Sequence, residues 1–125
     1  MFHIALMAKG LIMASYITNA FSLNMLSEIE NGLEYTIKTT TKRFDQARTY
    51  AIGMMSAVGH ADTANLFSSI LGIEVPVNRG TLQLKPGDWL LVGQYKGPRL
   101  PEGCVKLPEG ASVSWIIVEI TRAEY

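Results

Sequence analysis

Hydrophobic and polar positions follow two different periods along the chain, which predicts a protein that mixes strands and helices. Leu33–Ile37 alternates as a half-buried strand does, and the β-favouring residues of Ser15–Ala20 predict another strand. Met54–Val58 is expected to form a short buried strand. The nearly continuous apolar run Ser112–Ile120 is typical of an interior strand that is buried on both faces.

Two segments have the spacing of amphipathic helices. From Phe44 to Ala51 apolar residues recur at helical spacing, which predicts a helix of about three turns that ends near Gly53. Thr40 and Thr41 precede it, and threonine is a residue type that caps a helix start. We therefore expect one of these threonines to cap this helix.

The second predicted helix follows His60. Leu66 is spaced to contact Ile70, and Phe67 is spaced to contact Leu71, so the four side chains form one apolar stripe. A glycine follows directly, where glycine commonly ends a helix.

The stretch after this helix predicts a hairpin and a long loop. Gly80–Leu84 and Trp89–Gln94 both have the pattern of strands, and the Pro and Gly of Lys85–Asp88 between them favour a tight turn. The Gly- and Pro-rich segment Lys96–Gly110 is expected to be a loop, and a long loop beside a site is often a mobile lid.

The composition fits one compact domain. Of the 125 residues, 48% are hydrophobic and 18% are charged, so a packed core can form and wholesale disorder is not expected. We expect a single α/β domain over residues 15–125, with a mixed sheet of about five strands flanked by helices. Residues 1–14 are expected to be an N-terminal extension, with Met13 as the natural start of the protein.

Charge and apolar run lengths exclude some partners. The formal net charge is zero, which argues against a duplex-DNA partner, because such proteins need a broad basic face. A small anionic ligand is still compatible with this charge. Lys9 and Gly10 interrupt the apolar start of the chain, and no stretch reaches the roughly 20 residues that span a bilayer, so no membrane partner is expected.

The number and spacing of the cysteine and histidine residues indicate the cellular compartment and the cofactors to expect. Cys104 is the single cysteine, so no internal disulfide can form, and we expect a cytoplasmic protein. The cysteine and the histidines are not at the spacing of metal ligands, so neither a metal site nor another cofactor is expected.

His60 is the first candidate for chemistry. It comes after a short apolar run and a glycine, at the expected start of a helix. Such a position offers free backbone N–H groups and a partial positive charge, which suit an anion, and histidine is well matched to proton transfer near neutral pH. The alternative is an ordinary surface or capping histidine.

Further polar residues stand where strands are expected to end. Asn19, Ser22 and Asn24 follow the first strand, and ligands of open α/β sheets bind near the carboxyl ends of strands. Their alternative role is ordinary turn chemistry. Gln94 ends an apolar strand, where it either contacts a base or phosphate or simply marks the exit to solvent.

Two arginines and a glutamate complete the set of candidates. The planar guanidinium of Arg79 suits a phosphate, although a solvated surface position is equally compatible. Arg99 and Glu102 lie in the long loop, where a purely structural ion pair is the competing interpretation.

These residues occur in five blocks with a fixed order along the chain. The blocks are Asn-Ala-Phe-Ser-Leu-Asn-Met at 19–25, Ser-Ala-Val-Gly-His at 56–60, Val-Asn-Arg at 77–79, Gln94, and Arg-Leu-Pro-Glu-Gly at 99–103. In this combination the chain resembles the viral ring nuclease family, the type III anti-CRISPR enzymes, which also has cellular members. The resemblance covers roughly residues 16–110. It departs from some members at Lys96-Gly97-Pro98, where this chain is slightly longer.

The resemblance implies a homodimer that binds cyclic tetra-adenylate, the second messenger of type III CRISPR complexes. It implies cleavage without a metal ion to linear di-adenylate with 2′,3′-cyclic phosphate ends, which switches the signal off. The residues that it implies in catalysis are His60, as general acid, and Glu102, in the lid. Those that it implies in ligand binding are Asn19, Ser22, Asn24, Arg79, Gln94 and Arg99.

Two other functions are compatible with the sequence. One is a sponge that binds cyclic oligoadenylate without cutting it, and turnover of excess ligand distinguishes an enzyme from a sponge. The other is a regulatory interaction module, which would bind no oligoadenylate at all.

Overall fold

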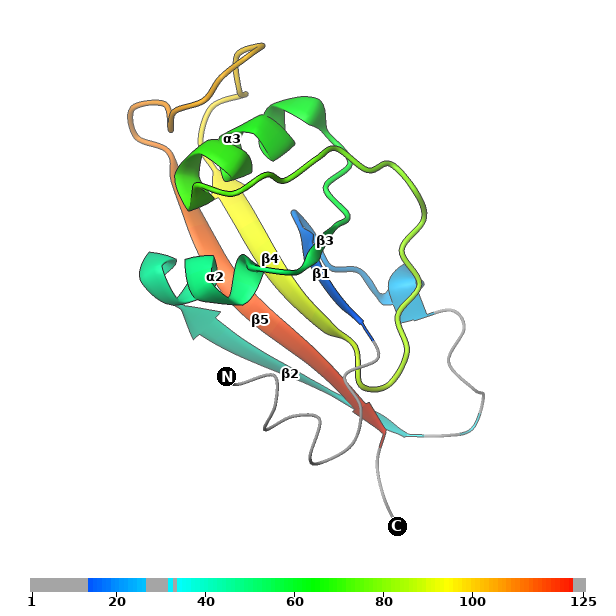
Figure 1. Cartoon of the computed structure of the whole chain (residues 1–125). Helices are drawn as coiled ribbons and strands as arrows, with labels where there is room; N and C mark the ends of the chain where they lie inside the picture. The colour runs from blue at the N-terminus through cyan, green and yellow to red at the C-terminus, as the bar shows by residue number, and fades with distance from the viewer. Residues whose placement is uncertain (1–13, 27–31, 33, 123–125) are drawn as a thin grey trace.

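The computed structural model describes residues 14–26, 32 and 34–122. Residues 1–13, which make up nearly all of the predicted extension and include Met13, lie outside the described residues, and so does residue 33. Along the chain the elements are β1 (Ser15–Thr18), the 3₁₀ turn η1 (Leu23–Leu26), β2 (Tyr35–Lys42), α2 (Phe44–Ala51), β3 (Met55–Ser56), α3 (Ala61–Leu71), β4 (Trp89–Lys96) and β5 (Ser112–Arg122) (Figure 1).

The strands form one mixed sheet, as predicted. Within the described residues it has five strands in the order β2-β5-β4-β1-β3. β1 runs parallel to both β3 and β4, whereas β5 runs antiparallel to β4 and β2. The carboxyl ends of β1, β3 and β4 therefore meet at one edge of the sheet, and α2 and α3 both cover one of its faces (Figure 1). The predicted α/β class with about five strands and two main helices is confirmed.

The predicted hairpin of Gly80–Leu84 with Trp89–Gln94 is wrong. β4 forms as expected, but β5 pairs along its whole length on one edge and β1 pairs with Trp89–Val92 on the other, so both edges are occupied where the hairpin would have to form. Gly80–Leu84 instead belongs to the strap, the segment of residues 73–84 after α3 that forms neither helix nor strand, and the Leu84 N–H donates to the carbonyl of Met25. The antiparallel neighbour of β4 is β5, and the predicted long loop connects the two.

The predicted turn at Lys85–Asp88 is present, although it joins the strap to β4. The Asp88 N–H donates to the Lys85 carbonyl at 3.0 Å, and the Lys85 N–H donates to Oδ2 of Asp88 at 2.9 Å. The turn is tied to β5 as well, because the Gly87 N–H donates to the carbonyl of Ile120.

The predicted threonine cap of α2 is also wrong. Thr40 and Thr41 lie inside β2, where they pair with residues of β5, so their backbones are fixed in the ladder. Arg43 is the N-cap residue, and its backbone N–H donates to Oε1 of Gln46 at 3.0 Å. With eight residues, α2 makes about two turns rather than three.

The predicted strand at Met54–Val58 is present only in part. β3 has two residues, and it lies at the edge of the sheet, which leaves Met55 54% exposed instead of buried. Val58 is buried and forms an isolated parallel bridge with Val77. The strap after α3 thus continues the sheet for one residue beyond β3.

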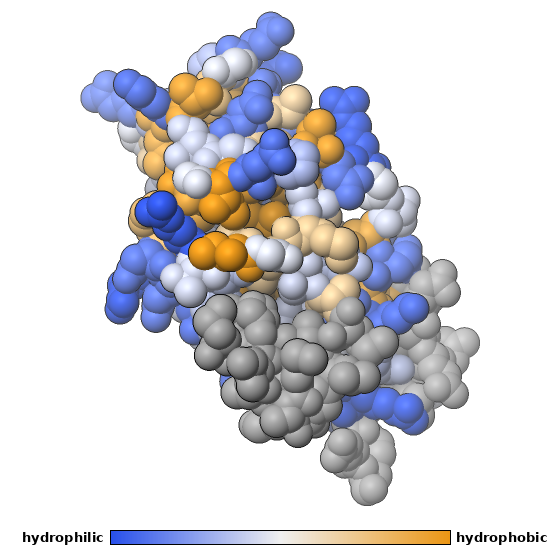
Figure 2. All heavy atoms as spheres, viewed as in Figure 1, coloured by the Kyte–Doolittle hydropathy of each residue, from blue (hydrophilic) through white to orange (hydrophobic). Residues whose placement is uncertain are grey.

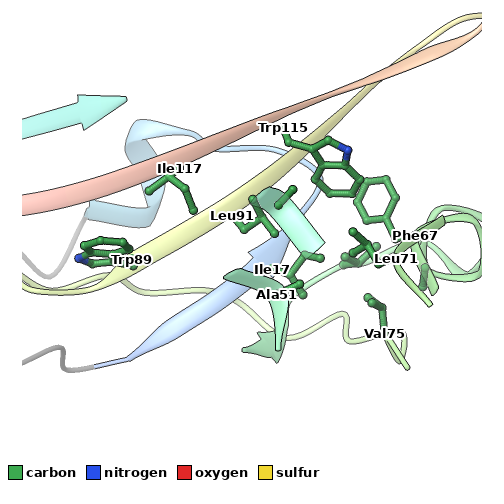
Figure 3. Close-up of a cluster of buried hydrophobic side chains, with 12 residues drawn as sticks. Ile17, Ala51, Phe67, Leu71, Val75, Trp89, Leu91, Trp115 and Ile117 are labelled. Atoms are coloured by element: carbon green, nitrogen blue, oxygen red, sulfur yellow. The ribbon is translucent and has the colours of Figure 1, made fainter. Parts of the chain in front are cut away.

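The main core lies between the helices and the sheet. Phe67 and Leu71 of α3 pack against Ile17 and Trp115 of the sheet, and the rings of Phe67 and Trp115 lie 5.1 Å apart (Figure 3). Gly93 of β4 makes this contact possible, because a Cβ there would lie 2.5 Å from the Phe67 ring. The apolar stripe predicted for α3 is therefore confirmed as its buried face.

A second apolar cluster covers the opposite face of the sheet. Leu90 and Val92 of β4 and Val118 and Ile120 of β5 are buried there. This result confirms that Ser112–Ile120 is an interior strand with both faces covered. In the space-filling view the topmost atoms are hydrophilic, and hydrophobic patches show just below them and across the middle of this face (Figure 2).

Candidate functional site

The candidate site lies where the parallel strands end. Asn19 directly follows β1, Gln94 lies near the end of β4, and His60 ends the segment that joins β3 to α3. Open α/β sheets bind ligands at this edge, because the loops that leave the strands there form a crevice. Three of the predicted residues are therefore placed at one edge by the topology of the sheet.

His60 is the N-cap residue of α3. Its backbone is extended (φ −117°, ψ 130°), and its carbonyl accepts the first helical hydrogen bond, from the Ala64 N–H at 2.9 Å. Its imidazole is exposed and makes no capping hydrogen bond, so it is free to face a ligand. The partial positive charge of the helix start lies directly beside it. Gly72, in the left-handed conformation, ends the same helix, as predicted.

Arg79 is held against the segment that carries His60. Its Nε donates to the carbonyl of Gly59 at 3.1 Å, one residue before the histidine. Asn78 reinforces this contact: its backbone N–H donates to the Val58 carbonyl, and its Nδ2 donates to the Ser56 carbonyl, both at 2.8 Å. The terminal nitrogens of the exposed Arg79 are left to bind an anion.

Ser56 completes this connection. Its hydroxyl donates to the carbonyl of Pro76 and accepts a hydrogen bond from the Val58 N–H. Sequence reasoning assigned no role to Ser56 or Asn78, although both stand inside blocks that carry the family resemblance. Their positions within these blocks were the signal that could have identified them.

Three pockets along this edge share residues with one another. The first, the His60–Arg79 pocket, has a volume of about 360 Å³, and Thr18, Asn19, Ala20, Met25, Ala57, Gly59, His60, Asn78, Arg79, Gly80 and Leu82 line it. The second, the His60–Arg99 pocket, has a volume of about 400 Å³, and His60, Asp62, Thr63, Tyr95, Gly97, Pro98, Arg99 and Leu100 line it. The third, the Asn19–Gln94 pocket, has a volume of about 240 Å³, and Asn19, Ala20, Phe21, Thr39, Val92, Gln94, Ile116 and Val118 line it.

The shared residues make these pockets neighbours, and the three together are called the crevice from here on. His60 lines the first and the second, and Asn19 lines the first and the third. Two arginines from distant parts of the chain thus flank one histidine. This arrangement can hold two anionic groups on either side of a proton donor.

The structure does not bring every predicted residue into these pockets. Ser22 and Asn24 are exposed in and before η1, and Glu102 is exposed in the long loop, and none of the three lines the pockets described above. The loop is nevertheless attached near His60, because the Gly103 N–H donates to Oδ1 of Asp62 at 3.4 Å. Glu102 is therefore one residue from a contact with the first turn of α3.

The buried carboxyl of Asp88 lies at the end of β4 that is opposite to the crevice. Asp88 is only 3% exposed, and burial raises its pKa, while its Oδ1 has no hydrogen-bond partner within the described residues. Burial, together with the nearby Asp88 carboxylate, also raises the pKa of Tyr16. These two groups precede β4 and lie in β1, away from the crevice at the other end of the sheet.

Two kinds of feature are absent from the described part of the chain: a cluster of metal ligands and a membrane-spanning helix. Residues 14–26, 32 and 34–122 hold no group of three or more His, Cys, Asp or Glu side chains that could bind a metal ion. No helix in those ranges has the length and apolar character needed to cross a bilayer.

Fold and site define a small single-domain α/β protein with an open mixed sheet and a crevice of neighbouring pockets at its parallel edge. Residues 15–111 match the STIV B116-like family, and the chain belongs to that family. Over 92 residues the chain is 35% identical to "Uncharacterized protein 26" of Sulfolobus islandicus filamentous virus (isolate Iceland/Hveragerdi), a match that covers 72% of this chain and 74% of that protein.

A solved structure of the same family supports the fold. B116 of Sulfolobus turreted icosahedral virus is similar with a TM-score of 0.65 and 27% identity, over 85% of this chain and 98% of that one. Both relatives are proteins of archaeal viruses, so the predicted membership of a viral protein family is confirmed. The ring nuclease activity stays a prediction.

Proposed function

We propose that this protein is a ring nuclease that cleaves cyclic tetra-adenylate without a metal ion. The products would be linear di-adenylates that end in 2′,3′-cyclic phosphates. Because the cyclic messenger activates the effector nucleases of type III CRISPR systems, its cleavage would switch the signal off. Such an activity fits a viral protein that acts inside a defended cell.

The observation that supports this proposal most is the position of His60 between two arginines. His60 lines one pocket with Arg79 and the adjacent pocket with Arg99. A cyclic oligonucleotide presents successive phosphodiesters, and a planar guanidinium can bind such a phosphate through paired hydrogen bonds. A ligand that spans both pockets would bring a phosphodiester to the exposed imidazole.

The proposed reaction uses the nucleophile that RNA itself carries. The ribose 2′-oxygen attacks the adjacent phosphorus in line with the 5′-oxygen, forms the cyclic phosphate and breaks the bond from phosphorus to that 5′-oxygen. His60 gives a proton to the departing oxygen, and the proton of the 2′-hydroxyl passes to solvent or to a nearby base.

The remaining residues would bind and enclose the ligand. Asn19 and Gln94 line the pocket next to the His60–Arg79 pocket, where their side-chain amides can hydrogen-bond a base, ribose or phosphate. Ser22 and Asn24 stand farther along the same loop and would contact the ligand from its outer side. Glu102 would join the site when the loop closes over the bound ring.

A homodimer would match the symmetry of the ligand. A ring of four identical nucleotides has equivalent halves, and a two-fold dimer presents each site twice. Two copies of His60 would then face opposite phosphates. Two copies of Arg79 and Arg99 would also supply four positive charges to a ligand with four negative ones, which a neutral monomer does not supply.

Chromatography of cyclic oligoadenylates after incubation with the purified protein tests the proposal. With ligand in large excess and a chelator present, we expect complete conversion of the cyclic tetramer to di-adenylate. Binding without turnover would identify a sponge, and the absence of binding in calorimetry would contradict both functions. Sedimentation should give a dimer, and a fully active monomer would contradict the proposed arrangement.

A further inference from the structure

The loop between β4 and β5 is held close to the strand that it leaves. The hydroxyl of Tyr95 donates to the carbonyl of Pro98 at 2.6 Å, a short and strong hydrogen bond. Gly97 makes this approach possible: its φ is +154°, and a Cβ there would lie 2.9 Å from the Tyr95 hydroxyl and 2.6 Å from the Cβ of Ala111. A side chain at position 97 would therefore displace the tyrosine or the far end of the loop.

The same loop is held a second time, five residues further on. The backbone N–H of Gly103 donates to Oδ1 of Asp62, which lies in the first turn of α3. At 3.4 Å this bond is longer than the Tyr95 bond and is expected to be the weaker of the two. It joins the loop to the helix that begins directly after His60.

Arg99 and Glu102 lie between these two attachments. Tyr95, Asp62 and Arg99 also line one pocket together with His60. We propose that Tyr95 and Asp62 are positioning residues, which hold the segment 98–103 at both ends and so keep the Arg99 guanidinium in the pocket that it shares with His60. This inference rests on the proposed function for the identity of the ligand, but the attachment itself does not.

The charge of Asp62 favours a positioning role over direct ligand binding. A carboxylate repels the phosphate groups for which His60 and Arg99 are suited, so a ligand gains nothing from it as a contact. As an acceptor for the Gly103 N–H, the same carboxylate has a structural use in this pocket. A substitution that removes this charge but keeps the acceptor oxygen should therefore not weaken ligand binding.

Tyr95→Phe tests the first attachment, because it removes one hydroxyl and keeps the ring. We expect the affinity for cyclic tetra-adenylate in calorimetry to fall about 2- to 10-fold, as for the loss of one hydrogen bond. In an Arg99→Ala background the same substitution should change the affinity by less than about 2-fold, because the group that it positions is gone. Tyr35→Phe, at the start of β2, is the matched control and should leave the affinity unchanged.

An equal loss of affinity in both backgrounds would show that Tyr95 acts on the ligand or on the fold and not through Arg99. No loss in the wild-type background would show that the hydroxyl positions nothing. Either result overturns the assignment of Tyr95.

Two substitutions of Asp62 test the second attachment. Asp62→Asn retains the acceptor oxygen and should bind cyclic tetra-adenylate at least as tightly as the wild type, whereas Asp62→Ala should bind more weakly. Weaker binding by the asparagine variant, to the level of the alanine variant, would show that the carboxylate charge itself is used, and it would overturn the assignment.

Hydrogen exchange of the free protein separates this inference from the proposed function. The hydrogen-bonded amides of Gly103 and Cys104 should exchange faster in Tyr95→Phe and Asp62→Ala than in the wild type, whether or not the protein binds or cleaves any oligonucleotide. Faster exchange with no ligand binding by the wild type would refute the ring nuclease proposal and retain the attachment. Unchanged exchange in both variants would refute the attachment.

Discussion

The two ends of β4 place polar residues in opposite environments. At the carboxyl end, Gln94 is exposed beside a crevice that also exposes His60 and Arg79. At the amino end, Asp88 is 3% exposed, and its carboxylate accepts the N–H of Lys85 within the turn that leads into the strand. The first set has side chains free for a ligand, whereas the second is used to close the fold. Substitutions at the two ends should therefore separate function from stability.

The largest effect is expected from His60→Ala. The loss of a general acid typically lowers a rate by about 10²–10⁴-fold, and we expect this loss in single-turnover cleavage of cyclic tetra-adenylate. Because the imidazole is exposed and caps nothing, the free energy of unfolding should change little. Quenched-flow or manual time courses, with urea denaturation alongside, measure the two quantities. Cleavage at the wild-type rate would reject His60 as the acid.

Arg79→Ala should act mainly on binding. A hydrogen bond to a charged group contributes about 1.5–3 kcal/mol, so KM should rise by at least about 10-fold. If Arg79 binds substrate and transition state equally, kcat should stay nearly constant. Steady-state kinetics measures this, with Arg122→Ala, at the end of β5, as the control at the opposite end of the sheet. A fall in kcat at constant KM would instead show that Arg79 stabilises only the transition state.

Asp88→Asn should change stability, with a dependence on pH. The pKa of Asp88 is higher in the folded protein than its usual 3.8, so folding favours the protonated form. The stability from this preference is present below 3.8 and is lost as the pH rises through the raised value. The asparagine variant cannot titrate, so its free energy of unfolding should exceed that of the wild type at neutral pH.

Urea denaturation of both proteins across the acid and neutral range measures this difference, which should shrink as the pH falls. Activity should be the same in both proteins at every pH, since Asp88 lies far from the crevice. A difference in stability that does not vary with pH would mean that Asp88 does not titrate with a raised pKa.

The smallest effect is expected from Asp45→Ala. Asp45 pairs with Arg43 at 3.2 Å at the start of α2, and both side chains are largely exposed. Side-chain hydrogen bonding to Arg43 lowers the pKa of Asp45, but water screens an exposed pair of this kind. Neither the melting temperature nor the activity should change measurably, at low or high salt. A clear loss of stability would show that the ion pair contributes more to the free energy of unfolding than a solvent-screened pair is expected to contribute.

The sequence correctly predicted elements whose formation depends on neighbouring residues and not on which distant segment they pair with. α3 has its apolar stripe, its glycine end and His60 at its start, all of which are local properties of the chain. The hairpin failed because pairing is decided between distant segments: Gly80–Leu84 has the pattern of a strand, but β1 and β5 occupy both edges of β4. The threonine cap failed for the same reason, since β5 extends β2 through both threonines.

The candidate site shows the same division. Sequence blocks identified His60, Arg79 and Arg99 one by one. Asp62 and Tyr95 were missed, because their contacts with Gly103 and Pro98 depend on where a long loop is placed relative to a helix and a strand. The roles of all these site residues remain predictions, and Ser22, Asn24 and Glu102 in addition lie outside the described pockets.

By itself, the sequence determined the mixed class, the helix that begins after His60, the interior strand Ser112–Ile120 and a resemblance to proteins of viruses. These depend on periodicity, capping and ordered residue blocks, which neighbouring positions encode. Only the tertiary structure decided which strands pair and that one histidine lies between two arginines. Such facts depend on long-range packing and on hydrogen bonds between segments, and no local pattern specifies them.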